Sequence, residues 1–262
     1  MRIALENVTI GAGLGASVPE LTATITEGVP NVLAVETAER PMLVSLLLGG
    51  RIRPDSGRVT VDGEENLDLL RKGTALVDTP VVAEPTAGLS IASIIAEEFS
   101  FAGLPSSRRA VHRFLHRHGM ADYARVPIRA LPPLRRTRMF SELALLRPAV
   151  TALVITSPER HGGDPAEWYD ALVEVAARGT TIAIVTDAAT RDLLIGLGAR
   201  DALSPAEGRE AGEAAGLTEA GEPREATGPT VADEPLDPAA LQLTDLDDAI
   251  TTTPATESEI RS

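Results

Sequence analysis

The sequence predicts an α/β protein whose core is a parallel β-sheet. Two fully apolar runs, at 152–155 and 181–185, are typical of strands that are buried on both faces of a sheet. Between them, residues 165–178 form an amphipathic pattern that begins with Asp164 as a helix cap and a proline at the first helical position. A strand, a helix and a second strand in this order indicate a parallel α/β core.

The first quarter of the chain adds more strands and one short helix. Residues 2–10 and 21–35 are predicted to form strands, and the second segment alternates near its start and ends in a buried apolar run. Residues 42–48 are apolar nearly all round, which predicts a buried helix that begins after Pro41 and ends at two glycines. A further strand is predicted at 58–62, before an Asp-Gly turn.

The middle of the chain is mostly helical. A short buried strand is predicted at 75–77, and helices are predicted at 89–99, 106–119 and 135–146. The second of these helices begins at a serine cap and ends at a glycine. A mostly helical stretch is therefore predicted between the strands at 75–77 and 152–155.

The helix predicted at 106–119 is strongly basic. Its basic residues are Arg108, Arg109, His112, Arg113, His116, Arg117 and His118. His112 and His116 have metal-ligand spacing, but no carboxylate or cysteine accompanies them, so a solvated face is favoured over a metal site. The functional alternative is a docking surface for an acidic partner, such as the acidic tail of the chain.

Acidic charge is concentrated at the C-terminal end. The chain has a net charge of −14, and residues 205–262 hold 14 acidic residues against three arginines. This segment is poor in apolar side chains, which predicts an acidic disordered tail. Within it, residues 237–250 have an aspartate cap and apolar residues at helical spacing, so they are predicted either to fold on a partner or to be ordinary solvated tail.

Composition excludes several classes of function. The chain has no cysteine, so it holds neither a disulfide nor a thiolate metal site. The net charge of −14 disfavours nucleic-acid binding, because the phosphate backbone requires an excess of basic groups. No apolar run resembles a signal peptide or a membrane span, so we expect a soluble, cytoplasmic protein. The glycines at 11–15 are expected to form a hairpin loop, because no helix is predicted after them as a dinucleotide-binding turn requires.

The segment 43–63, LVSLLLGGRIRPDSGRVTVDG, carries the most specific pattern in the chain. It resembles the helix, turn and hairpin that follow the phosphate loop of an ATP-binding cassette (ABC) ATPase. Other segments that match this family in order are 21–35, 89–91 and 176–181. Residues 1–204 therefore resemble an ABC ATPase subunit. The resemblance implies a P-loop-NTPase-like ABC cassette with a parallel sheet core, an antiparallel β subdomain and a helical subdomain at about 84–147.

The phosphate loop of this family reads G-x-x-x-x-G-K-[ST], whereas this chain reads AVETAERP at 34–41. Arg40 stands at the position of the lysine, Pro41 at that of the Mg²⁺-binding hydroxyl and Glu39 at that of the preceding glycine. Glycines let backbone N–H groups close around phosphates, whereas carboxylates repel them. The vestigial loop consists of Ala34, Glu36, Glu39, Arg40 and Pro41.

The other nucleotide-site positions of the family are also replaced. The replacements are Thr79 in the glutamine loop, Leu131, Pro132 and Pro133 in the signature, Thr156 and Ser157 for the Asp-Glu pair, and Asp187 for the switch histidine. The loss of the Asp-Glu pair removes the Mg²⁺-linked carboxylate and the general base. The only lysine of the chain is Lys72 and the only glutamine is Gln242, so no shift of the alignment restores either motif.

These replacements predict that the chain has lost the ATPase motifs. The resemblance then implies a structural or regulatory pseudo-ATPase that docks on a membrane permease through the helical subdomain, with an active ABC ATPase subunit as a second partner. No catalytic residue, metal or cofactor is expected. The expected location is the cytoplasm, including peripheral association with the inner face of the cell membrane.

Two other functions compete with this interpretation. The chain could be a divergent but active ABC subunit that binds ATP and Mg²⁺, with Arg40 in place of the lysine and a carboxylate from Asp78, Asp164 or Asp187. It could instead be a soluble interaction scaffold without a transporter. A hydrolytic triad of Ser157, His161 and Asp164 is disfavoured, because no nucleophile-elbow glycines surround the serine.

Overall fold

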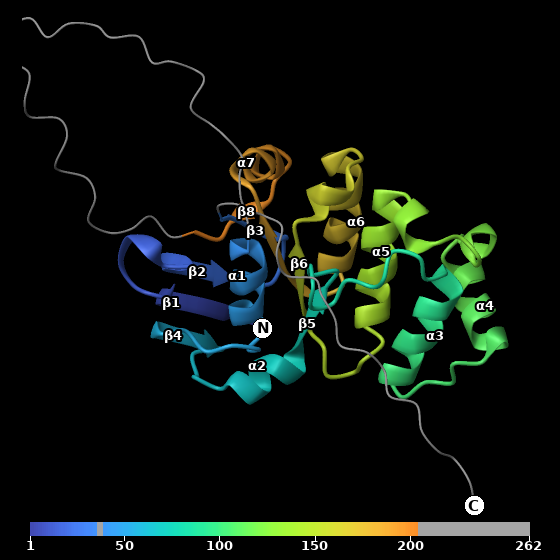
Figure 1. The fold of residues 1–262 in the computed structure, drawn as a ribbon, viewed down its shortest axis with the longest axis horizontal. Helices are drawn as coiled ribbons and strands as arrows, with labels where there is room; N and C mark the ends of the chain where they lie inside the picture. The colour runs from blue at the N-terminus through green and yellow to red at the C-terminus, as the bar shows by residue number, and fades with distance from the viewer. Residues whose placement is uncertain (36–38, 204–262) are drawn as a thin grey trace, which may run out of the picture. The chain divides into compact units, whose positions relative to one another are not determined.

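The computed structural model describes residues 1–35 and 39–203, and its larger sheet has five parallel strands in the order β5-β6-β7-β3-β8 (Figure 1). Their bounds are β3 Asn31–Ala34, β5 Thr74–Val77, β6 Ala152–Thr156, β7 Thr181–Thr186 and β8 Arg200–Asp201. Every residue of β6 and β7 is buried. This confirms the predicted parallel α/β core. Glu36 and the predicted tail at 205–262, with its 237–250 segment, lie outside the described residues.

The smaller sheet is antiparallel, with the strand order β2-β1-β4. Its strands are β1 Ile3–Ile10, β2 Val18–Ile25 and β4 Ser56–Val61. The glycine-rich loop joins β1 to β2 and contains only a short 3₁₀ turn, so it is the predicted hairpin loop. β2 begins three residues before its predicted start, because Val18 pairs with Ile10. Gly57 has φ +73°, and a Cβ there would lie 2.3 Å from the carbonyl oxygen of Asn7, so only glycine fits.

Seven helices lie within the described residues. They are α1 Arg40–Leu48, α2 Leu67–Gly73, α3 Ile91–Phe101, α4 Arg108–Arg117, α5 Pro133–Ala144, α6 Pro165–Ala176 and α7 Ala188–Gly196. The five predicted helices are confirmed to within two residues at each end. The patterns missed α2 and α7, although each begins at a polar cap: the side chain of Asn66 accepts from the N–H of Leu69, and that of Asp187 from the N–H of Thr190.

The two faces of the parallel sheet bury two separate apolar clusters. On one face, α1 lies between the two sheets, and its Val44, Leu47 and Leu48 are fully buried. On the other face, α5 and α6 pack on the sheet, and α3 and α4 extend the cluster beyond them (Figure 1). Trp168 and Tyr169 of α6 are the largest side chains of this second cluster. In the part of the chain that the structure describes, no helix is both long and apolar enough to cross a membrane.

Candidate functional site

The junction of β3 and α1 is the position at which the resemblance places the phosphate loop. Ala34 ends β3, and α1 begins at Arg40. Glu39 immediately precedes the helix, is exposed and makes no capping hydrogen bond through its side chain. The N-terminus of a helix favours anions. Here that end already carries a carboxylate of the chain itself.

The resemblance places Arg40 and Pro41 at the positions of the family's lysine and Mg²⁺-binding hydroxyl. The Arg40 Nε donates a hydrogen bond to the carbonyl oxygen of Ser17, at 3.0 Å, in the loop between β1 and β2. Pro41 lies in the first turn of α1, so it offers neither a hydroxyl nor an N–H. Its carbonyl oxygen instead accepts a hydrogen bond from the Ser45 Oγ, at 2.8 Å.

Three buried hydroxyl groups, one of them on α1 itself, form a hydrogen-bonded chain. The Oγ1 atoms of Thr79 and Thr156 lie 2.8 Å apart, and the Thr156 Oγ1 donates to the Ser45 Oγ at 2.8 Å. All three side chains are fully buried. Thr156 ends β6, where the resemblance places the carboxylate linked to Mg²⁺. The position therefore carries neutral groups that are already hydrogen-bonded to one another.

Asp78, directly after β5, forms a buried ion pair with Arg136 of α5. The Arg136 Nε and Nη2 donate to the two carboxylate oxygens of Asp78, each at 2.6 Å. The His161 Nε2 lies 2.8 Å from the same carboxylate, and the Arg160 Nη2 donates to the Asp78 carbonyl oxygen at 2.6 Å. Glu84 completes the cluster, 3.3 Å from Arg160 and 3.6 Å from Arg136. These five residues come from three separate segments of the chain: the loop after β5, helix α5 and the turn after β6.

The electrostatics of this cluster favour the ionised form of Asp78. Burial by itself would raise the pKa of this carboxyl, but the hydrogen bonds from Arg136 and His161 and the charges of Arg136 and Arg160 hold it below its usual value. Ligand atoms of Asp78, Glu84 and His161 lie within 4.8 Å of one another, which is close enough to hold a metal. However, two guanidinium groups already neutralise the two carboxylates. A divalent cation added there would meet both arginines at short range.

The other carboxylates considered from the sequence are helix caps. The Asp164 Oδ1 accepts from the N–H of Ala166 at 2.9 Å, and the Asp187 Oδ1 accepts from the N–H of Thr190 at 2.7 Å. His161 binds Asp78, and the geometry provides no Ser157–His161–Asp164 triad among the described residues. Ser157 has φ +46°, a left-handed conformation at the turn after β6.

The start of α5 is where the resemblance places the signature motif. Leu131 is buried, Pro132 precedes the helix and Pro133 is its first residue. Neither proline has an N–H, so this helix end lacks two of the donors that would otherwise face a bound anion. The Arg136 that binds Asp78 follows about one turn later in the same helix, and no sequence pattern identified it.

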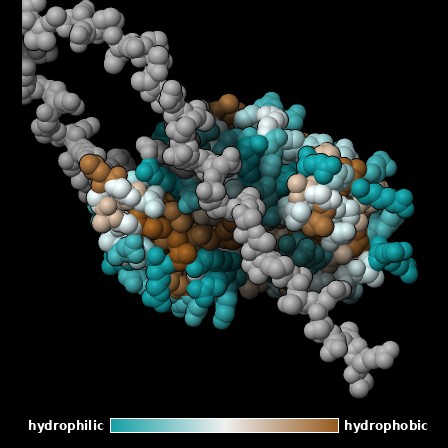
Figure 2. Space-filling model, in the orientation of Figure 1, coloured by the Kyte–Doolittle hydropathy of each residue, from teal (hydrophilic) through white to brown (hydrophobic). Residues whose placement is uncertain are grey.

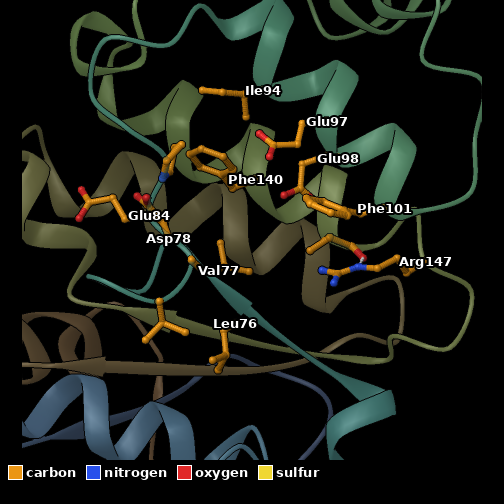
Figure 3. A pocket seen from close by; sticks show the side chains of 14 residues that line it. Leu76, Val77, Asp78, Glu84, Ile94, Glu97, Glu98, Phe101, Phe140 and Arg147 are labelled. Carbon is orange, nitrogen blue, oxygen red and sulfur yellow. Dashed lines mark hydrogen bonds between the residues drawn. The ribbon is translucent and has the colours of Figure 1, made fainter. Parts of the chain in front are cut away.

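A groove of about 320 Å³ lies between α3, α5 and the loop that follows β5 (Figure 3). Val82 and Phe101 line it and are 47% and 69% exposed. Glu97 and Glu98 of α3 face Arg147 across it (Figure 3). Burial raises the pKa of Glu98, the neighbouring Glu97 raises it further, and Arg147 opposes this shift.

The loop beside the groove carries a strained residue. Val81 has φ +66° and is 92% exposed. A β-branched residue rarely adopts this left-handed conformation. The loop therefore holds an apolar side chain out in solvent at a conformational cost.

Solved ATP-binding cassettes have the same fold as the described residues. A nucleotide-free ATP-binding cassette from an ABC transporter is 14% identical, with a TM-score of 0.56 over 74% of this chain and 85% of that chain. A bacterial ABC transporter cassette solved as a dimer is 17% identical, with a TM-score of 0.54 over 72% of this chain and 90% of that chain. The post-hydrolysis state of a dimeric cassette, bound to ADP and Pi, is 17% identical, with a TM-score of 0.55 and the same coverage.

No protein-family model matches the chain, and no curated protein matches its sequence. At these identities the structural likeness establishes the fold and not the activity. The expected ABC cassette fold, with a parallel sheet, an antiparallel sheet and a helical insertion, is thus confirmed.

Proposed function

We propose that this chain is a structural or regulatory ABC-type subunit that has lost its ATPase motifs and docks on a membrane permease. In this proposal residues 1–204 form the degenerate cassette, residues 84–147 carry the docking surface, and neither ATP nor Mg²⁺ is needed. The similar solved cassettes come from ABC transporters, which supports a partner of this class. The protein then lies in the cytoplasm and reaches the inner face of the membrane through its partner.

The observation that carries the proposal is that the chain's own groups occupy the expected nucleotide site. Glu39 places a carboxylate at the helix end where a phosphate would bind, and Pro41 removes a hydroxyl and a donor. Thr156 replaces the carboxylate for Mg²⁺ with a hydroxyl that already has two hydrogen-bond partners. A phosphate near Glu39 would be repelled by about 1–4 kcal/mol per pair of unit charges at about 4 Å, depending on solvent exposure.

The groove beside α3 supports the docking role. Val82 and Phe101 expose large apolar surfaces at its edge, and Val81 is held exposed in a strained conformation. Strain of this kind tends to persist where the surroundings or a function require it. Exposed apolar side chains around a groove are typical of a surface that a partner covers.

Among the described residues, the three carboxylates considered for Mg²⁺ in the competing ATPase function already have partners. Asp78 is neutralised by Arg136, while Asp164 and Asp187 cap helices. The donor set therefore does not fit a bound Mg²⁺ without rearrangement of the buried cluster. The scaffold alternative differs from the proposed function only in its partner. A permease gene next to the gene of this protein would favour the transporter function.

Co-purification with that permease tests the docking role. We expect the full chain to co-purify with the permease in the absence of nucleotide, and Phe101→Glu to abolish this by placing a charge on the apolar edge of the groove. Leu14→Glu is the matched control, because Leu14 is also a largely exposed apolar residue but lies in the β1–β2 loop. Equal loss in both variants, or permease cross-links confined to residues 1–70, would refute docking through the groove.

A further inference from the structure

One half of α4 (Arg108–Arg117) is a continuous basic surface. At about 100° per residue, its exposed basic residues fall within one half of the helix circumference. They are Arg108, Arg109, His112, Arg113, His116 and Arg117. The opposite half, with Val111, Phe114 and Leu115, is buried in the core. The core therefore fixes this helix with its basic half directed to solvent.

These charges are not balanced locally. Residues 103–121 contain no aspartate or glutamate, although the whole chain has a net charge of −14. Among residues 1–35 and 39–203, no carboxylate lies within 4.0 Å of any of the four α4 arginines. Arg108 and Arg109 also occupy the first turn of the helix, where the macrodipole disfavours cations. The arrangement is thus unfavourable within the folded chain and suited to an anionic partner.

Exposed apolar side chains lie at the N-terminal end of this surface. Phe101 ends α3 and is 69% exposed, and Leu104, in the turn before α4, is 39% exposed. Figure 2 shows hydrophilic side chains along the edge of the molecule that carries α4, with hydrophobic patches between them. Basic side chains next to exposed apolar ones are typical of segments that bind the interface of an anionic bilayer.

We infer that the basic half of α4, together with Leu104, binds the anionic headgroups of a phospholipid bilayer. The solvent-exposed basic half of the helix matches an array of phosphate groups in charge. Attraction acts within the Debye length of about 8–10 Å, so acidic groups farther away oppose it little. This surface does not depend on a permease, and it would hold the chain at the membrane with or without one.

Vesicle sedimentation with the full chain tests the inference. We expect binding to mixed phosphatidylglycerol–phosphatidylcholine vesicles and none to pure phosphatidylcholine. The double variant R109Q/R113Q should bind about 25-fold more weakly, since each arginine near an anionic surface contributes about fivefold. Leu104→Ser should weaken binding severalfold, because it removes an inserted apolar side chain. Raising the salt to about 1 M should also release the protein, because the Debye length falls to about 3 Å.

The matched control is the double variant R53Q/K72Q. It removes two exposed positive charges that lie outside α4, and it should bind the vesicles like the parent chain. An equal loss in both double variants, or no binding to anionic vesicles at physiological salt, would overturn the inference. The inference would also be overturned if R109Q/R113Q lost binding to a polyglutamate peptide and kept its binding to vesicles. That result would assign the surface to an acidic protein.

Discussion

Replacement of Arg136 by methionine removes the cation that neutralises Asp78. Both 2.6 Å hydrogen bonds are lost, and the carboxylate, which is only 9% exposed, keeps His161 and Arg160 as its neighbours. Breaking a buried ion pair by removing one partner costs about 3–5 kcal/mol. Against a typical domain stability of about 5–15 kcal/mol, this is a large fraction of the total. We therefore expect Arg136→Met to lower the free energy of unfolding by about 3–5 kcal/mol.

Urea unfolding followed by tryptophan fluorescence measures this loss. Trp168 is the only tryptophan of the chain and is 1% exposed, so its emission reports unfolding of the core. Arg138→Met is the control on the same helix, because Arg138 pairs with Glu174 at the surface. An exposed ion pair contributes about 0–1 kcal/mol, so the control should be nearly neutral.

The pH dependence follows from the pKa of Asp78. Because this pKa is lowered in the folded chain, the stability contributed by the carboxylate is present at neutral pH and is lost as pH falls through the folded pKa. In Arg136→Met, burial with fewer partners should raise the pKa, so that the group becomes neutral sooner on acidification. The stability difference between parent and variant should therefore begin to shrink as pH falls through the raised pKa of the variant, and should go on shrinking until pH passes the lowered pKa of the parent chain.

Two outcomes would refute this reasoning. One is a decrease in the free energy of unfolding of Arg136→Met that is less than about 1 kcal/mol or no greater than that of Arg138→Met. Either result would place the Asp78–Arg136 pair among weak surface interactions. The other is a stability difference that stays constant or grows from neutral to acidic pH.

Further predictions concern the hydroxyl chain, a cap and the groove. Thr156→Val should cost about 1–3 kcal/mol in urea unfolding, because it leaves the buried hydroxyl of Thr79 without its partner; a neutral result would contradict this. Asp187→Ala should cost about 1 kcal/mol through loss of the α7 cap, and Asp187→Ser should restore most of it. Phe101→Glu should leave the unfolding midpoint unchanged, since the side chain is largely exposed; a large shift would show that it belongs to the core.

Patterns local in sequence predicted most of the fold. The buried strands β6 and β7 and the helix between them follow from apolar periodicity and from the Asp164 cap, all within one short stretch of chain. The short helix α2 was missed because seven residues carry too little periodicity, although Asn66 and Leu67 formed a usable start signal.

The polar interior of the site could not be predicted in the same way. Asp78 and Arg136 are 58 residues apart, and Thr156 and Ser45 are 111 residues apart. Only the folded sheet and the packing of α5 bring these partners together, and no local pattern records the pairing. The sequence did hold one signal of this pairing, which was Asp78 directly after the apolar strand at 75–77. A charge at the end of a buried strand needs a partner.

Titration calorimetry with ATP and Mg²⁺ tests the central claim, the loss of nucleotide binding, most directly. The full chain should show no binding with a dissociation constant in the micromolar range, with or without Mg²⁺, since Glu39, Pro41 and Thr156 occupy the site. A dissociation constant near 10 μM or tighter, about −7 kcal/mol, would contradict the account. If Arg40→Gln then abolished this ATP binding, the competing function, in which this arginine holds the phosphates, would be established.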